Sequence, residues 1–279
     1  DVCCSIEKGS YTAIIGPSGA GKSTLLQMIP ALISPTDGNI YVDGLEVTDA
    51  SADIAALRKK IGFIFQYPEQ QLFAKNVYED VVFGPRNVGI SEVEAEKRAY
   101  EAIQFVGLPQ DVYDLPMDKL SGGQKRRVAL AGVIAMQPDY LILDEPLAGL
   151  DPVGKKKMLD ILHALHRDAG ITVVVVSHDA DAVVEDAEQV LYLQDGKILE
   201  YGTPADVFYR LWRRKMDDMS QGMTGRQTLD NKILSEALCE LPVCMQLLMR
   251  LRMMGLPVSC RHTQPAETVQ AIVDAVDRL

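Results

Sequence analysis

A run of nine residues near the start of the sequence has the composition and spacing of a phosphate-binding loop. It satisfies the pattern Gly-x4-Gly-Lys-Ser/Thr between a strand predicted over residues 11–15 and a helix predicted over residues 23–29, which argues against a chance glycine-rich turn. Glycines at this spacing let backbone N–H groups surround the β- and γ-phosphates of a nucleotide. We expect Lys22 to neutralise those phosphates and the hydroxyl of Ser23 to ligate Mg²⁺. The predicted ATP-binding residues are Gly16, Pro17, Ser18, Gly19, Ala20, Gly21, Lys22, Ser23 and Thr24.

A pair of carboxylates stands at the end of a later apolar run. Residues 141–143 are Leu-Ile-Leu, and Asp144 and Glu145 follow directly. In phosphate-loop enzymes a carboxylate at this place holds Mg²⁺, which we expect of Asp144. Its neighbour Glu145 is placed to polarise the attacking water as general base. An acidic pair at a strand end is also typical of helix capping or a solvated turn, but the phosphate loop in the same chain favours the catalytic interpretation.

Between these motifs a short segment consists of Ser121, Gly122, Gly123 and Gln124, before a helix predicted over residues 125–136. A helix N-terminus offers backbone N–H groups to an anion, although Ser-Gly-Gly is also a common turn. Placed after the phosphate loop and before the acidic pair, the segment resembles the signature motif of ATP-binding cassette (ABC) proteins. The resemblance implies that these four residues cap the γ-phosphate held by an opposing subunit, so that each ATP lies between two chains.

Three more residues resemble landmarks of the same family. Gln66, after a strand predicted over residues 61–65, resembles the Q-loop glutamine, which contacts Mg²⁺ and water and senses a transmembrane partner. Asp151 resembles the D-loop, which links the two active sites. His178, after a strand predicted over residues 172–176, resembles the switch histidine that contacts the γ-phosphate, whereas the other three histidines lack such context and are interpreted as surface residues. The implied catalytic residues are Lys22, Gln66, Glu145 and His178, and the implied Mg²⁺ ligands are Ser23, Gln66 and Asp144.

Three local features resemble the energy-coupling factor ATPases within that family. They are the segment Gln-Tyr-Pro-Glu-Gln-Gln-Leu-Phe at residues 66–73, Phe-Gly-Pro-Arg-Asn at residues 83–87, and Gly132 where most importer ATPases carry arginine. The resemblance implies a subunit that hydrolyses ATP to power uptake of a vitamin or a transition-metal ion at the cytoplasmic membrane face. It also implies a second ATPase chain, identical or related, a transmembrane scaffold and a substrate-binding membrane subunit. Residues 66–73 and 81–87 are the expected scaffold surface, unless their apolar members only pack a helical subdomain.

The elements that position these motifs alternate short apolar runs with helical stretches, as in an α/β nucleotide-binding domain. Residues 140–143 and 172–176 are continuously apolar, which predicts strands buried on both faces of a mixed, mostly parallel sheet. Residues 91–106 are typical of a helix. Residues 190–193 and 197–200 flank an Asp-Gly turn and predict a hairpin. The expected fold is a phosphate-loop NTPase of the ABC type with a helical signature subdomain.

A change of composition divides the chain into a predicted ATP-binding domain, residues 1–209, and a small helical extension, residues 210–279. Seven of the eleven methionines lie in the extension. Residues 220–225 predict a linker, Leu247, Leu248, Leu251 and Met254 predict an amphipathic helix, and residues 266–276 predict another helix. The extension is interpreted as packing on its own domain or on a partner ATPase. Contact with a membrane surface through residues 213–215 and recognition by another protein are the alternatives.

Charge and composition exclude several function classes. The net charge of −11 argues against nucleic-acid binding, because a surface that follows a phosphate backbone is basic. No apolar run has the length of a membrane-spanning helix. Five cysteines without metal-ligand spacing favour a reducing compartment. The remaining rivals are an ATPase of a conventional importer or exporter, a soluble ABC protein acting on ribosomes or DNA, and a catalytically defective subunit; the complete set of acidic and histidine residues argues against the last.

The sequence departs from the family pattern in two places, and each departure leads to an expectation about ATP binding or hydrolysis. Leu147 stands where many ABC proteins have a hydroxyl residue, which removes no obligatory group. The family's adenine-stacking aromatic and first strands would precede Asp1, so the sequence looks like a fragment. We therefore expect ATP binding weakened by about one or two decades, from a stacking loss of roughly 1–3 kcal/mol. An unpaired sheet edge and lower stability are also expected.

Overall fold

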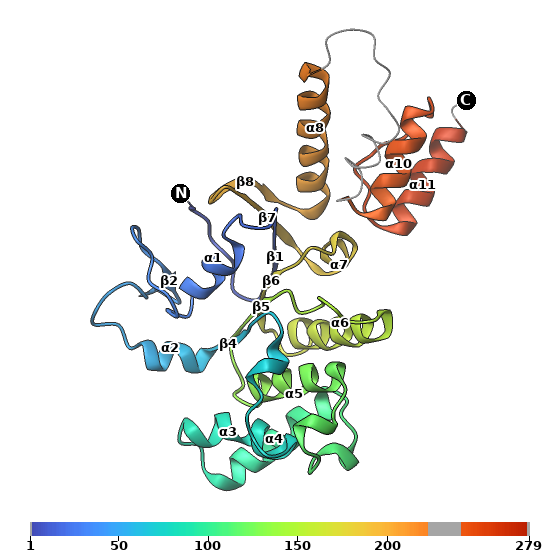
Figure 1. Cartoon of the computed structure of the whole chain (residues 1–279). Helices are drawn as coiled ribbons and strands as arrows, with labels where there is room; N and C mark the ends of the chain where they lie inside the picture. Colours follow the sequence, from blue (N-terminus) through green and yellow to red (C-terminus); the bar gives the residue numbers. More distant parts are fainter. Residues whose placement is uncertain (1, 223–240, 278–279) are drawn as a thin grey trace. The chain divides into compact units, whose positions relative to one another are not determined.

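The computed structural model describes residues 2–222 and 241–277, which form two compact units (Figure 1). One unit comprises residues 5–11 and 21–177, and the other comprises the described parts of residues 1–4, 12–20 and 178–279. No helix in the described part of the chain is both long enough and apolar enough to cross a membrane.

The first unit is organised on three parallel strands in the order β4 (Ile61–Ile64), β5 (Tyr140–Asp144) and β6 (Thr172–Val176). Asp144 at the end of β5 is paired in register with Val176 at the end of β6. All five residues of β6 are buried, as are four of the five in β5, which agrees with the continuous apolar runs in the sequence. The helices α1 (Lys22–Met28) and α6 (Pro152–Arg167) pack against β5 and β6 respectively.

A helical layer of the same unit carries the signature segment. It consists mainly of α3 (Val77–Asn87), α4 (Glu92–Phe105) and α5 (Gly122–Ile134), which contact one another. Ala95, Ala99 and Ala102 recur at helical spacing and form the buried face of α4. The helix predicted over residues 125–136 corresponds to α5. It begins three residues earlier than predicted, because Ser121 caps it. The 3₁₀ turns η1 (Pro68–Gln71), η2 (Gln110–Val112) and η3 (Met117–Lys119) connect this layer.

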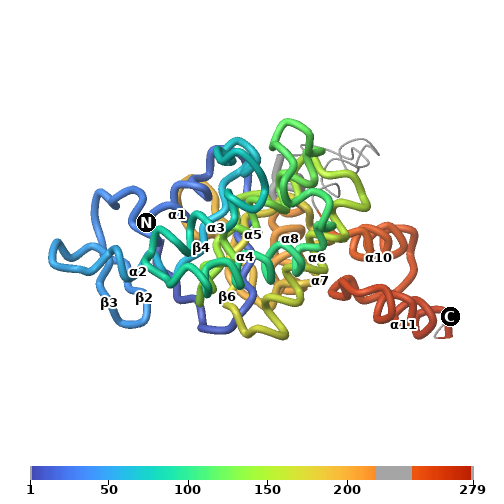
Figure 2. The backbone as a smooth tube through the Cα atoms, turned by 90° about the horizontal axis from the view of Figure 1, so that it is seen from below, coloured from blue at the N-terminus to red at the C-terminus, as the bar shows by residue number. Residues whose placement is uncertain are grey.

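The remaining elements of the first unit immediately precede β4 in the sequence. The helix α2 (Ile54–Lys60) leads directly into β4, and Asp53 caps it by accepting a hydrogen bond from the backbone of Ala56. A two-stranded hairpin is formed by β2 (Tyr41–Val42) and β3 (Leu45–Glu46). Figure 2 shows this hairpin next to α2.

In the second unit β1 (Tyr11–Ile15), through its residues 12–15, pairs in parallel with β7 (Gln189–Gln194). The strand β8 (Lys197–Gly202) is antiparallel to β7, with Asp195 and Gly196 in left-handed conformations at the turn. The predicted hairpin is confirmed. The strand pairs of the sheet are mostly parallel, with one antiparallel pair between β7 and β8, so the expected mixed sheet is also confirmed. Among its described residues this unit has the helices α7 (Ala180–Asp186), α8 (Pro204–Gly222), α10 (Val243–Met253) and α11 (Pro265–Val276).

The C-terminal helices pack on their own unit. The backbone N–H of Val243 donates to Asp181 of α7 at 2.8 Å, and the Gln264 amide donates to the carbonyl of Val184 at 2.9 Å. The Arg261 guanidinium lies 4.8 Å from the ring centre of Tyr209 on α8. Figure 2 shows α10 and α11 side by side, in agreement with their contacts. Packing of the extension on its own domain is thus observed.

Three details of the predicted extension need correction. The proposed boundary after residue 209 falls inside α8, which continues to Gly222, so the start of the predicted linker is helical and its remainder lies outside the described residues. The buried face of α10 is formed by Met245, Leu248 and Met249. Leu247 and Met254, predicted on the apolar stripe, are 46% and 84% exposed, because the helix docks with a different rotation.

Candidate functional site

The phosphate loop (residues 16–24) has a backbone that only glycine adopts readily at several positions. Gly16, Gly19 and Gly21 have φ angles of 144°, 81° and 97°. A Cβ atom on Gly16 would lie 2.0 Å from the carbonyl oxygen of Leu193, so no side chain fits there. Gly21 is the left-handed residue that starts α1. These conformations bring backbone N–H groups to the start of the helix, where a phosphate accepts hydrogen bonds.

Lys22 is a buried cation, with 6% of its surface exposed. Burial lowers the pKa of Lys22, and the negative charges of Glu145 and Asp144 oppose that shift. A lysine held in this balance interacts strongly with an incoming phosphate, because the low local dielectric strengthens the attraction. The position fits the predicted role in neutralising the nucleotide.

The end of β5 presents the two carboxylates in different settings. Asp144 is 4% exposed, whereas Glu145 is half-buried and has a left-handed backbone with φ of 51°. The N–H of Glu145 donates to the carbonyl of Val176 at 3.0 Å, which fixes its backbone against β6. The Gln66 side-chain amide donates to Glu145 Oε2 at 3.0 Å. Lys22, Gln66 and both carboxylates are therefore brought together within one unit.

The donor set around this point suits Mg²⁺. The predicted ligands Ser23, Gln66 and Asp144 would supply hydroxyl, amide and carboxylate oxygens, the hard ligands that Mg²⁺ prefers. Within the described residues no cluster of three His, Cys, Asp or Glu side chains forms a metal cage. Because Mg²⁺ commonly takes substrate phosphates and water as its other ligands, these three residues could hold it together with a bound nucleotide.

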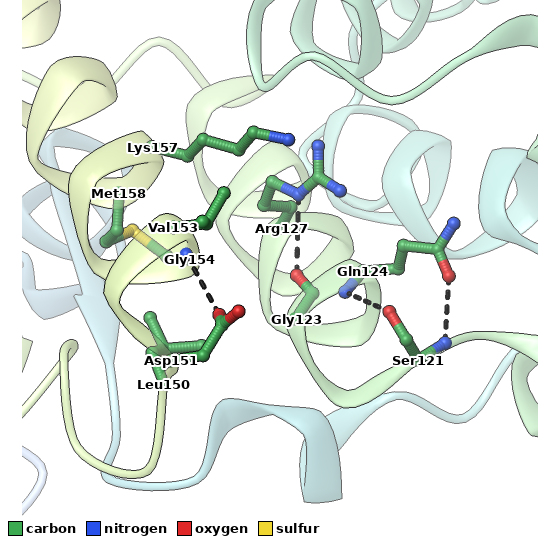
Figure 3. Close-up of a pocket in the computed structure, with 10 residues that line it drawn as sticks. All are labelled: Ser121, Gly123, Gln124, Arg127, Leu150, Asp151, Val153, Gly154, Lys157 and Met158. Atoms are coloured by element: carbon green, nitrogen blue, oxygen red, sulfur yellow. Dashed lines mark hydrogen bonds between the residues drawn. The ribbon is translucent and has the colours of Figure 1, made fainter.

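The signature segment (residues 121–124) and the D-loop lie around one cavity of about 350 Å³ in the same unit (Figure 3). Ser121 caps α5 through a reciprocal pair of bonds: its Oγ accepts from the Gln124 N–H at 3.2 Å, and its N–H donates to Gln124 Oε1 at 2.8 Å. Asp151 caps α6 by accepting from the Gly154 N–H at 2.9 Å. The structure thus brings the predicted Ser121, Gly123, Gln124 and Asp151 to a single concave surface.

Sequence reasoning missed two cations of this cavity. Arg127 and Lys157 both line it, and their side chains extend toward the same space in Figure 3. Arg127 donates to the carbonyls of Gly107 at 2.7 Å and Val106 at 3.3 Å, and burial lowers its pKa. The basic run at residues 125–127 was a visible signal for Arg127, but Lys157 lies 30 residues further on and is brought there only by the fold.

His178 follows β6 by two residues, as predicted, and is exposed. It belongs to the second unit, whereas the two carboxylates belong to the first. Its assignment as switch histidine remains a prediction from the family pattern.

Comparison with known proteins identifies the family. The model of the ABC transporter family matches residues 1–148. An energy-coupling factor transporter ATP-binding protein EcfA2 from Latilactobacillus sakei subsp. sakei is 48% identical over 206 residues, which are 73% of this chain and 71% of the relative. EcfA2 of Symbiobacterium thermophilum is 45% identical over 233 residues, 84% of this chain and 80% of the relative.

Solved structures agree with the sequence relatives. CbiO1 from Clostridium perfringens, described as part of the ABC transporter complex cbiONQ, has a TM-score of 0.68 and 39% identity, covering 76% of this chain and 84% of that one. A dimeric post-hydrolysis state of the ATP-binding cassette MJ0796 bound to ADP and Pi has a TM-score of 0.65 and 34% identity, covering 72% and 88%. The phosphate loop, the acidic strand end and these relatives together show that the chain belongs to the ABC transporter ATPases of the energy-coupling factor family.

Proposed function

We propose that this ATPase subunit of an energy-coupling factor importer hydrolyses ATP with Lys22, Gln66, Asp144, Glu145 and His178 serving its own nucleotide. The hydrogen bond between the Gln66 amide and Glu145 Oε2 is the observation that carries the assignment. It joins two segments 79 residues apart at the point where a buried lysine and a buried aspartate also meet. Ser121 and Gly123 are assigned to the nucleotide of the opposing chain.

The chemistry follows from these positions. The N–H groups of the phosphate loop and the Lys22 ammonium hold the β- and γ-phosphates and stabilise the charge that grows on them. Glu145 accepts a proton from water as the water oxygen bonds to the γ-phosphorus, and the bond to the β–γ bridging oxygen breaks to leave ADP and phosphate. Bound Mg²⁺, held through Ser23, Gln66 and Asp144, would supply further charge neutralisation. The Gln66 amide orients the Glu145 carboxylate by donating to one of its oxygens.

The surface after Gln66 is assigned to the membrane scaffold. Phe73 and Phe83 are 66% and 48% exposed, and their rings form an edge-to-face pair with centroids 4.8 Å apart. The N–H groups of Phe73 and Ala74 both donate to Asp80 at 3.0 Å, which fixes this loop on α3. The neighbouring Val81 and Val82 are fully buried and serve packing. An exposed aromatic pair formed between this loop and α3 suits an apolar helix of a partner protein.

The assembly we propose contains a second ATPase chain, identical or related, the transmembrane scaffold and a substrate-binding membrane subunit. The ATPase would be peripheral on the cytoplasmic face and would power uptake of a vitamin or a transition-metal ion. The C-terminal extension is assigned to the contact between ATPases. Val269, Val273 and Val276 support this, because they are about half exposed and recur on α11 at intervals of four and three residues.

The replacement Glu145→Gln tests the assignment. It keeps the size of the side chain and the contact to Gln66 but removes the base, so ATP affinity should stay within a few-fold while kcat falls by roughly 10²–10⁴. Hydrolysis is measured as phosphate release by the assembled transporter, and ATP affinity by calorimetry. Glu101→Gln, on the exposed face of α4, is the matched control. Hydrolysis by Glu145→Gln at the wild-type rate would contradict the proposal.

A further inference from the structure

Arg126 is a buried charge that the proposed mechanism does not use. It lies one turn into α5, after the signature segment, and is 5% exposed. A buried ion pair is weak support for stability, because desolvation of both charges offsets much of their attraction. The contacts of the guanidinium indicate another role.

One side of the guanidinium faces the segment that follows Gln66. Arg126 Nη2 lies 3.3 Å from Glu69 Oε1, and Nε donates to Glu69 Oε2 at 3.4 Å. Glu69 lies on η1, three residues after Gln66, and Tyr67 between them has a left-handed backbone with φ of 59°. Through Glu69 the Arg126 side chain is thus tied to the segment formed by residues 66–69.

The other side of the guanidinium faces the turn that follows the proposed base. Arg126 Nη1 donates to the carbonyl of Pro146 at 3.4 Å and to the carbonyl of Ala148. These carbonyls belong to the turn of residues 145–148, which the Ala148 N–H closes by donating to the Glu145 carbonyl at 3.2 Å. Glu145 begins this turn in a left-handed conformation, which costs a non-glycine residue energy and persists only when the surroundings hold it.

The two segments are therefore connected twice. One connection is direct, from the Gln66 amide to the Glu145 carboxylate, and the other passes through Arg126, from Glu69 to the backbone after Glu145. The planar guanidinium carries five N–H donors in a fixed fork, so it can bind a carboxylate and two carbonyls together. A lysine ammonium at the end of a flexible chain has no such fork.

We propose that Arg126 is a positioning residue that sets the orientation of Glu145 according to the position of residues 66–69. This inference rests on the proposed role of Glu145 as general base. Because residues 66–69 belong to the expected scaffold surface of residues 66–73, displacement of this segment is transmitted to the base both at its carboxylate and at its backbone. Arg126 acts through these contacts and is assigned no contact with nucleotide or water.

The test measures ATP affinity and hydrolysis separately in the assembled transporter. Glu69→Gln keeps the shape of the side chain but removes its charge, and Arg126→Lys keeps the charge but removes the fork. Each should leave the Kd for ATP within about twofold and lower kcat by roughly ten- to a hundredfold, as small displacements of a catalytic group do. Arg98 and Glu94, a half-buried pair on α4 at 2.8 Å, provide the matched controls Arg98→Lys and Glu94→Gln, which should change neither quantity.

Exchanging the two charges distinguishes the contribution of the ion pair to kcat from that of the carbonyl contacts. The double variant Glu69→Arg with Arg126→Glu restores opposite charges, but a carboxylate at residue 126 cannot donate to the carbonyls of Pro146 and Ala148. Its kcat should remain low. Wild-type kcat in Glu69→Gln or in the exchange variant, or loss of ATP affinity in parallel with kcat, would overturn the positioning role. If Glu145→Gln alone retains hydrolysis, the assignment of the base fails instead.

Discussion

The two regions of the first unit that are proposed to contact nucleotide differ in how their polar groups are held. Around the end of β5, Lys22, Asp144 and Arg126 are each less than 10% exposed and contact groups from distant parts of the chain. Around the cavity at the start of α5, Ser121 and Asp151 are exposed and bond mainly within their own helix termini.

This difference indicates which region is complete in a single chain. Burial among opposite charges holds the groups at the end of β5 in place, which would preorganise that region for the proposed phosphate and water. The cavity beside Ser121 is instead lined by a hydroxyl, the carboxylate of Asp151 and the two cations Arg127 and Lys157. A concave surface of this chemistry fits an anionic group carried by another chain, in agreement with the proposed composite site.

Among the variants that test this comparison, the largest effect is expected at Ser121, where a pair of replacements distinguishes capping from ligand contact. Ser121→Asp retains a good N-cap but adds a negative charge to the cavity, so hydrolysis should fall by about 10²–10³ with little loss of stability. Ser121→Ala removes the cap and should lower the free energy of unfolding by about 1 kcal/mol. Phosphate release and chemical denaturation measure the two effects.

The outcome at Ser121 also tests whether the two regions serve the nucleotides of different chains. ATP binding to a single chain should be unchanged in both variants, since the cavity serves the other chain's nucleotide. If Ser121→Asp hydrolyses ATP normally, the cavity is not the second half of the site. Loss of ATP affinity by the isolated chain would place Ser121 in the same half as Lys22.

An intermediate effect is expected at Gly16 in the phosphate loop. Gly16→Ala puts a Cβ atom 2.0 Å from the carbonyl oxygen of Leu193, so the free energy of unfolding should fall by about 2–3 kcal/mol. Gly132→Ala is the control, because its Cβ would meet only Val81 Cα at 4.0 Å and alanine favours the helix. Equal stability of both variants in urea denaturation would contradict the rigidity ascribed to the loop.

The smallest effect is a pH dependence of ATP affinity through Lys22. Burial lowers its pKa below the ordinary value of 10.5, and phosphate favours the protonated form. Affinity should therefore fall by up to about tenfold per pH unit as pH rises through the lowered pKa, with proton uptake on binding. Calorimetry in buffers of different ionisation enthalpy measures this above the last ionisation of ATP. Lys22→Arg should abolish the dependence, since arginine stays protonated; a flat wild-type profile would contradict the assignment.

The fold could largely be predicted from the sequence, because the patterns that indicate its strands, turns and helices are local. The apolar runs of β5 and β6, the Asp-Gly turn between β7 and β8 and the alanine spacing of α4 each depend on neighbouring residues. The extension was less predictable. Leu247 and Met254 have suitable spacing, yet the rotation of α10 is decided by contacts with α7 and α11, which no local pattern contains.

For the site, the sequence by itself determined the chemistry: a glycine-rich loop with Lys22, the acidic pair, the signature segment and their order along the chain. Only the tertiary structure decided which of these groups touch. The bond between Gln66 and Glu145 spans 79 residues, and the contacts of Arg126 reach Glu69, 57 residues earlier, and Pro146, 20 residues later. Such contacts form only when strands and helices pack together. Packing brings together segments that are far apart in the sequence, and no local sequence pattern predicts which of them will meet.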